Sequence, residues 1–379
     1  MRLRPLKNLA LQCKHRSEEP VSHVKIALFS PDGSSCIAVL NDSYIAIYNT
    51  TDNSELCYID PNATLSTEAG ANVLPTSIID CYDDVRDIRF FPNFTSSDPD
   101  SCCFLVASRG TPVHLYDIRG GKHHFSYKPI NFHGELDEVY SLDFHPLGKY
   151  FLCGGKGSIY VFDVETPGTD IELRRLYTNR KRGHCGIISA IAHNPHSYNV
   201  YACGDYNANI GIYDHNTSRQ NSLFGSFGDG MQPMGPITQI SWLSEHTLLE
   251  GGRNDVYIRI FDIRGTCGEP VMRFRRPAKS NQRIEFDIQD AVIVSGTSDG
   301  DVISYTTSSE EPKSILKIAE TPVSSAKYHP NRSLMLTASG TRTFGSDPED
   351  ICSVAVVTLW SISDSNDTTQ YHVNPDAIT

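Results

Sequence analysis

The stretch Ile159-Tyr160-Val161-Phe162-Asp163 is a short hydrophobic run that ends in an aromatic residue followed by aspartate. Six further runs end in an aromatic residue, usually with a polar residue after it, at residues 45–49, 113–117, 210–214, 258–262, 302–306 and 356–360. Their aromatic residues are 44 to 68 positions apart along the chain. A repeat of this kind, with an aromatic–aspartate ending, is typical of the blades of a β-propeller.

The repeat around this stretch predicts four strands, at residues 139–144, 150–153, 159–163 and about 172–177. The turn His145-Pro146-Leu147-Gly148 separates the first two strands, and Gly154-Gly155-Lys156-Gly157 separates the second from the third. Proline and glycine preset the backbone angles of such turns. Because similar turns recur in the other repeats, the sequence predicts an all-β, seven-bladed propeller of the WD40 type.

The first repeat begins near Val24, which leaves a strand unassigned at the start of the chain. Residues of about 8–14 are expected to supply the fourth strand of blade seven and so to close the ring, which removes exposed sheet edges. Residues 1–365 then form one domain, with insertions at about 52–77, 92–101, 122–137 and 343–353. A polar tail, 366–379, is expected to be disordered.

The composition excludes several classes of protein. No run of 18 apolar residues occurs and no apolar stretch of signal-peptide length follows the basic start, so we expect an intracellular protein with no membrane association. The eleven cysteines are scattered and form no C-x-x-C pair, so reduced thiols are expected rather than a metal site. Cys36, Cys153, Cys203 and Cys352 lie in or beside strand-like runs, as small core residues would.

No pattern typical of an enzyme is present. The chain has no G-x-S-x-G, P-loop or H-E-x-x-H motif. His123, His124 and His133 fall in the expected loop-like insertion and are interpreted as surface residues. The aspartates that end the repeated strands occupy equivalent positions, so their role is structural. We therefore expect a non-catalytic protein without cofactor or small-molecule substrate.

The charge is unevenly distributed, although the net charge is −12. In a propeller, the second-to-third-strand turns of each blade and the loops between blades leave the ring on one face, here called the candidate face. These connections carry Arg109, Lys156, Arg180, Lys181, Arg182, Arg253, Arg275, Arg276, Lys279, Arg283 and Arg342. The connections on the opposite face carry Asp32, Asp98, Asp100, Glu165, Asp170, Glu245, Glu310 and Glu311. Asp347, Glu349 and Asp350 fall on the candidate face and weaken the separation locally.

A basic face with aromatic residues favours single-stranded nucleic acid, because cations neutralise phosphates and rings stack on splayed bases. Tyr206 and Phe344 are the expected stacking residues, and Asn281 and Gln282 are expected to contact base edges. The predicted RNA-binding set is Arg109, Lys156, Arg180, Lys181, Arg182, Tyr206, Arg253, Asn281, Gln282, Arg283, Arg342 and Phe344. Solvated loops, or contact with an acidic protein, are the alternatives that charge alone leaves open.

Two segments are more specific than the general propeller repeat, namely Gly186-Ile187-Ile188-Ser189-Ala190-Ile191-Ala192-His193-Asn194-Pro195 and Asn281-Gln282-Arg283-Ile284-Glu285-Phe286-Asp287. Both resemble segments of a known family, the telomerase Cajal body proteins. The resemblance spans roughly residues 17–345. It implies a WD40 propeller that binds a loop motif, the Cajal body box, in H/ACA-type small Cajal body RNAs and telomerase RNA.

The resemblance also implies partners and a location. The expected partners are these RNAs, H/ACA ribonucleoprotein proteins and other Cajal body proteins, and the expected location is the nucleus and its Cajal bodies, with the cytoplasm as a second location. The family often has a long acidic N-terminal extension, whereas the propeller repeats here begin almost at residue 1. Trp242-Leu243-Ser244-Glu245 also replaces the family's usual His-Pro-x-Gly turn.

The main alternative function is a protein–protein scaffold. A substrate receptor or histone-peptide reader would use the same candidate face to bind an acidic partner. Binding to one RNA loop that is lost when the loop is mutated would distinguish the two functions.

Overall fold

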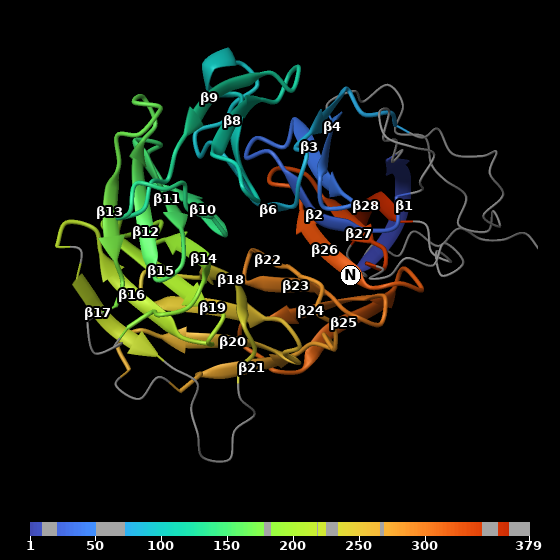
Figure 1. The fold of residues 1–379 in the computed structure, drawn as a ribbon. Coiled ribbons are helices and arrows are strands. Elements are labelled where there is room, and N and C mark those ends of the chain that lie inside the picture. The colour runs from blue at the N-terminus through green and yellow to red at the C-terminus, as the bar shows by residue number, and fades with distance from the viewer. Residues whose placement is uncertain are drawn as a thin grey trace, which may run out of the picture.

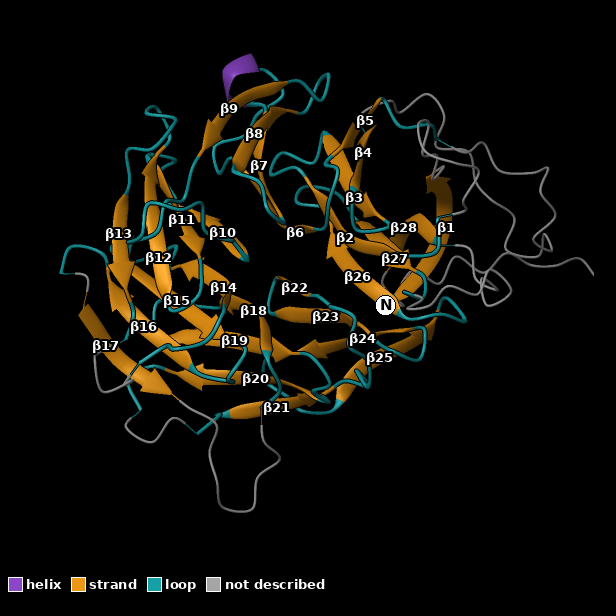
Figure 2. Cartoon of the chain, in the orientation of Figure 1, coloured by secondary structure: helices purple, strands orange, loops and turns teal. Residues whose placement is uncertain are grey.

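Seven antiparallel sheets of four strands surround a central channel in the computed structural model (Figure 1). The structure describes residues 1–9, 21–50, 73–177, 183–217, 219–224, 234–265, 269–342 and 355–363. The seven-bladed all-β propeller that the repeats predict is therefore confirmed. Strands account for nearly all of its regular structure, and the helix η2 (Pro99–Ser101) is a single short turn (Figure 2).

The strands of each blade follow one another from the channel outward. Blades one to three contain β2 (Val24–Phe29), β3 (Ser35–Leu40), β4 (Tyr44–Asn49) and β5 (Ser77–Asp80); β6 (Val85–Phe90), β7 (Cys103–Ser108), β8 (Val113–Asp117) and β9 (His123–Tyr127); and β10 (Ser141–Phe144), β11 (Tyr150–Gly154), β12 (Ser158–Asp163) and β13 (Glu172–Arg175). Blades four and five contain β14 (Ile188–His193), β15 (Val200–Asp205), β16 (Ile210–Asp214) and β17 (Arg219–Phe224); and β18 (Ile237–Trp242), β19 (Thr247–Gly252), β20 (Tyr257–Asp262) and β21 (Met272–Arg275). Blades six and seven contain β22 (Phe286–Gln289), β23 (Val292–Gly296), β24 (Asp301–Thr306) and β25 (Pro312–Lys317); and β26 (Val323–Tyr328), β27 (Leu334–Ser339), β28 (Val356–Ser363) and β1 (Arg2–Leu9).

The N-terminal strand closes the ring, as predicted. β1 pairs antiparallel with β28 from Arg2 opposite Ser363 to Leu9 opposite Val357, and the two lie side by side in Figure 1. The strand covers 2–9 rather than 8–14, and residues 10–14 lie outside the described part of the chain. The basic residues at the start of the chain made this strand hard to recognise in the sequence. Pro5 is compatible with an outermost strand, because one side of such a strand has no hydrogen-bonded neighbour.

The hydrophobic core lies between the blades. Each of the seven clusters of buried residues joins two neighbouring blades, as Tyr48 of blade one and Val357 of blade seven illustrate. The repeated aromatic residues of the third strands occupy these interfaces, and Tyr48, Phe162, Tyr213 and Phe261 are almost completely buried. The repeated aromatic residues that identified the fold in the sequence are therefore residues of the hydrophobic core.

The predicted buried cysteines are confirmed where they can be seen. Cys36, Cys153 and Cys203 are fully buried on β3, β11 and β15, and Cys352 lies outside the described residues. Burial raises the pKa of the Cys36 thiol to about 12. The thiol is therefore protonated near neutral pH and acts as a small apolar side chain.

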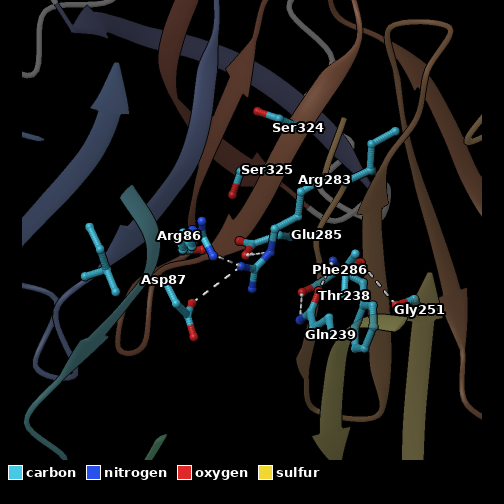
Figure 3. A network of polar contacts seen from close by, with 12 residues as sticks. Arg86, Asp87, Thr238, Gln239, Gly251, Arg283, Glu285, Phe286, Ser324 and Ser325 are labelled. Atoms are coloured by element: carbon cyan, nitrogen blue, oxygen red, sulfur yellow. Dashed lines mark hydrogen bonds and ion pairs between the residues drawn. The ribbon is translucent and has the colours of Figure 1, made fainter. Parts of the chain in front are cut away.

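The innermost strands of neighbouring blades are joined by polar side chains. Asp87 accepts a 2.8 Å hydrogen bond from the Leu142 amide of the next blade. Gln239 bonds both the N–H and the carbonyl oxygen of Phe286, at 2.9 and 2.8 Å (Figure 3). These contacts hold the blades in register around the channel and satisfy backbone groups that ladder bonds do not reach.

Part of the predicted insertion at 122–137 is a strand. His123 and His124 belong to β9, the fourth strand of blade two, and not to a loop. Their side chains face outward, where His123 Nε2 lies 3.2 Å from His114 Nδ1. The insertion at 92–101 contains η2. Most of the insertion at 52–77, all of the insertion at 343–353 and the tail 366–379 lie outside the described residues.

Candidate nucleic-acid interface

A cavity of about 240 Å³ opens where the channel meets the candidate face. Five residues of the predicted set line it, and they come from blades two, four, five, six and seven. They are Arg109, Tyr206, Arg253, Arg283 and Arg342. The other lining residues are Lys25, Asp84, Arg86, Tyr140, Ser189 and Thr238. The fold thus brings residues that are more than 230 positions apart in the sequence together at one cavity.

Lys25 and Arg86, which sequence reasoning missed, follow from a repeated position on the innermost strands. Each innermost strand is entered through a valine or isoleucine, and the next position is equivalent in all seven blades. Its residues in blades one to five, Lys25, Arg86, Tyr140, Ser189 and Thr238, line the cavity, whereas Glu285 and Ser324 do not. Irregular pairing at this point in five of the strands marks a β-bulge, a device that redirects a side chain. The pairs Val24-Lys25 and Val85-Arg86, at the starts of two innermost strands, could therefore have identified Lys25 and Arg86 from the sequence.

Carboxylates also lie on the candidate face, so the expected separation of charge is too simple. Arg342 is 2.5 Å from Asp42, and Lys25 contacts both Asp42 and Asp84. Asp42 lies in the turn between β3 and β4 and was not counted in the predicted charge distribution. Burial alone would raise the pKa of Asp42, but the hydrogen bond from His23 and the nearby cations outweigh it and lower the pKa to about 2.

Two further cations of the cavity have carboxylate neighbours. Arg86 lies 2.6 Å from Glu138, and Arg109 lies 3.9 Å from Asp83 and 3.8 Å from Asp84. The Arg109 side chain is 54% exposed, so its distant pairs are weak. A ligand that approached this face could compete for Arg109 at little cost.

Two arginine–tyrosine pairs in cation–π contact line the cavity. The guanidinium carbon of Arg86 lies 4.1 Å from the centre of the Tyr140 ring, and that of Arg253 lies 5.4 Å from the centre of the Tyr206 ring. Arg253 has no carboxylate within ion-pair distance among the residues that the structure describes. Its charge is therefore the most available of the cavity cations to an external anion.

Arg283 lies deeper than its predicted role implies. It is only 9% exposed, and its guanidinium lies 3.4 Å from Asp87 and 3.1 Å from Glu285 (Figure 3). Glu285 also contacts Lys327 at 3.4 Å. Arg283 also lines a second cavity of about 350 Å³ in the channel. Its side chain therefore borders both cavities, and two carboxylates already balance its charge.

The remaining predicted residues are distributed over the face. Asn281 is exposed and accepts a 2.5 Å hydrogen bond from Asn254. Gln282 donates to the carbonyl oxygen of Gly340 over 3.1 Å and links the loop between blades five and six to blade seven. Lys156 is exposed and does not line the cavity.

Some predicted basic residues lie elsewhere or cannot be placed. Arg180, Lys181, Arg182 and Phe344 are outside the described residues. Arg276, which was expected on the candidate face, is fully buried between blades five and six. Within the described ranges no helix has the length and apolar character to cross a membrane, and no three or more His, Cys, Asp or Glu residues are grouped to hold a metal ion.

Comparison with known proteins agrees with this architecture. The family model described as "WD domain, G-beta repeat" matches residues 127–163, which run from the end of β9 through β12. Telomerase Cajal body protein 1 of Mus musculus is 30% identical over 328 residues, covering 83% of this chain and 58% of that protein. The Bos taurus protein of the same name is 28% identical over 340 residues, 86% of this chain and 59% of its own length.

The chain is a relative of the telomerase Cajal body proteins. The resemblance found in the sequence is thereby confirmed, and it covers most of the propeller. The chain spans about three fifths of the length of these telomerase Cajal body protein relatives. A protein named guanine nucleotide-binding protein negative regulator 1, from Schizosaccharomyces pombe, is 24% identical over 292 residues, 75% of this chain and 70% of that protein.

Proposed function

We propose that the chain is a non-catalytic RNA-binding protein whose candidate face binds an unpaired loop in an H/ACA-type small Cajal body RNA or telomerase RNA. Through this contact it accompanies the ribonucleoprotein to Cajal bodies in the nucleus, together with H/ACA proteins. The names of its relatives support the telomerase and Cajal body association. The observation that carries the proposal is the convergence of Arg86, Tyr140, Tyr206 and Arg253 at one cavity.

This arrangement suits an RNA loop for a physical reason. A loop exposes unstacked bases and a curved backbone, so it offers rings for stacking and phosphates for cations within a small area. Tyr206 and Tyr140 provide rings, and Arg109 and Arg253 provide charge that the propeller does not fully neutralise. A double helix has no splayed bases to offer such a cavity.

The first test is the salt dependence of binding to a hairpin that carries the loop motif. Fluorescence anisotropy should show affinity that falls with salt and is lost when the loop nucleotides are changed. The double variant Arg109→Gln/Arg253→Gln should bind at least tenfold more weakly, and its plot of log affinity against log salt should be shallower by about 1.4, since each single-strand phosphate contact contributes about 0.7.

A matched control uses two arginines of the opposite face. Arg119 and Arg264 are exposed and lie on turns between third and fourth strands. Arg119→Gln/Arg264→Gln changes the net charge equally and should leave loop binding intact. Equal weakening by both double variants, or equal affinity for any polyanion, would favour a scaffold for acidic proteins over loop recognition.

A further inference from the structure

We propose that the cavity at the channel mouth is a phosphate site, in which one phosphate group is held between the guanidinium edges of Arg86 and Arg253. The inference deepens the proposed function and rests on it for the carrier of the phosphate, which would be a backbone linkage of the bound loop. Free phosphate has the same chemistry, so the experiment below includes both sources.

The neighbours of the two arginines limit which donors they present to the cavity. The guanidinium carbon of Arg86 lies over the Tyr140 ring and that of Arg253 lies over the Tyr206 ring. The N–H donors of a guanidinium lie in its plane, and the edge is the part that recognises phosphate. Glu138 already contacts Nη2 of Arg86, so Nη1 of Arg86 and the edge of Arg253 are the donors that remain for a ligand.

Each of the two arginines also has a buried nitrogen without an acceptor. Arg86 Nη1 and Arg253 Nε are shielded from solvent and have no hydrogen-bond partner within the described part of the chain. Buried donors are nearly always paired, and an unpaired one is costly. Two such donors on residues that line one cavity support a ligand that draws both side chains toward it and supplies the missing acceptors.

The cavity selects an anion of suitable shape and size. Arg86 comes from blade two and Arg253 from blade five, so donors reach the hollow from well-separated parts of the ring. A phosphate group carries oxygens on more than one side and can accept from both, whereas a carboxylate carries its two oxygens on one side. The volume, about 240 Å³, is below the roughly 300–1,000 Å³ of pockets for whole small molecules. One phosphate with the adjoining part of a nucleotide fits this description.

The charges around the cavity favour binding of a single anion. The lining contains six cationic side chains, from Lys25, Arg86, Arg109, Arg253, Arg283 and Arg342, and one carboxylate, from Asp84. Carboxylates behind the lining, such as Asp42 and Glu138, offset most of this charge. The positive charge that these carboxylates do not offset is concentrated on Arg253, which contacts the Tyr206 ring and no carboxylate among the described residues.

The experiment replaces each phosphate linkage of the RNA loop in turn by an uncharged methylphosphonate. For the wild-type chain, one loop linkage should cost at least tenfold in affinity while its neighbours cost less than threefold. In Arg253→Gln the same replacement should cost less than threefold, because the contact has already been lost. Arg86→Gln should show the same coupling, and Arg264→Gln should behave like wild type.

A second measurement does not depend on RNA. Inorganic phosphate, compared with chloride at equal ionic strength, should raise the melting temperature of the wild type and of Arg264→Gln but not that of Arg253→Gln. Arg109→Gln, at an exposed side chain that is not expected to affect folding, should reduce the rise. Equal stabilisation of all variants would mean general anion binding and would overturn the site.

The outcomes separate this inference from the proposed function. Loop-specific RNA binding in which no linkage couples to Arg86 or Arg253 would overturn the phosphate site and leave RNA recognition standing. Phosphate stabilisation that depends on Arg253, without any discrimination between RNA loops, would support the site for a free anion and overturn the RNA proposal.

Discussion

The buried guanidinium of Arg276 donates a 3.2 Å hydrogen bond to the carbonyl oxygen of Gly252. Its other terminal nitrogen donates to the carbonyl oxygen of Ile284 over 2.9 Å. Gly252 directly precedes Arg253, and Ile284 directly follows Arg283. One side chain inside the propeller therefore joins the two chain segments that carry four residues of the predicted RNA-binding set.

Replacing Arg276 should disturb both segments and the fold. Arg276→Met leaves two buried carbonyl oxygens, those of Gly252 and Ile284, without their donor, so the free energy of unfolding should fall by about 2–5 kcal/mol. Urea denaturation measures this change. Arg275→Gln, at the exposed neighbouring residue, should change it by less than about 0.5 kcal/mol. Equal effects of the two variants would contradict the bridging role.

Glu250 should make stability fall as pH rises. Burial, reinforced by Asp255, raises the pKa of Glu250 to about 8 despite the opposing effect of Arg259. The folded state then holds a proton that the unfolded chain loses near pH 4.5, so folding is favoured below that pH and the gain is lost between about pH 4.5 and 8.

Glu250→Gln mimics the protonated carboxyl and tests this dependence. The free energy of unfolding of the wild type, minus that of Glu250→Gln, should decrease by about 1–3 kcal/mol from pH 5 to pH 8. Denaturation at four pH values measures the difference. A constant difference would show that Glu250 stays ionised beside Arg259, from which it is 3.2 Å distant.

Leu9 should be essential for ring closure. It is buried at the interface of blades seven and one, so Leu9→Ala should lower the free energy of unfolding by about 2–5 kcal/mol. Thermal melts and size-exclusion chromatography would detect the loss and any association through the freed edge of β28. Arg2→Ser/Arg4→Ser, at exposed positions of the same strand, should melt like the wild type; if it melts as early as Leu9→Ala, charge and not packing holds β1.

Tyr206 should contribute to RNA binding through its ring. Tyr206→Ala should weaken binding of the loop RNA by about 1–3 kcal/mol, and Tyr206→Phe should retain most of the affinity because it keeps the stacking surface. Anisotropy titrations at one salt concentration measure both. Tyr198→Ala is the control, since Tyr198 is 43% exposed on the opposite face. If Tyr206→Ala binds like wild type, the ring does not contact a base.

The sequence predicted the fold well because the repeated aromatic residue is also the residue that fills the interface between blades. Phe162 and Tyr213 are buried for the same reason that they recur. The N-terminal strand was located but shifted, since its side chains belong to no repeat. Its pairing depends on β28 at the far end of the chain, which local pattern does not encode.

The site was predictable only in part. Turn positions correctly predicted that Arg109, Tyr206 and Arg253 lie on one face, where they line a common cavity, because loop direction in a propeller is fixed by topology. The burial of Arg283 and Arg276 was not predictable from charge, since their partners, Asp87 and Gly252, are distant in the sequence or belong to the backbone. A basic residue in a loop can be buried when a carboxylate or a carbonyl oxygen from another part of the fold accepts a hydrogen bond from it.

The pairing of Arg2 with Ser363 has a consequence for biosynthesis. At roughly 5–20 residues added per second, the ribosome needs on the order of 20–70 s to reach the partner of the first strand. During that time β1 is an unmatched β-strand on a nascent chain, exposed to neighbouring polysomes and to wrong pairing. The last blade therefore cannot be completed before β28 has been synthesised, and a chaperone that shields β1 until then should raise the yield of closed rings.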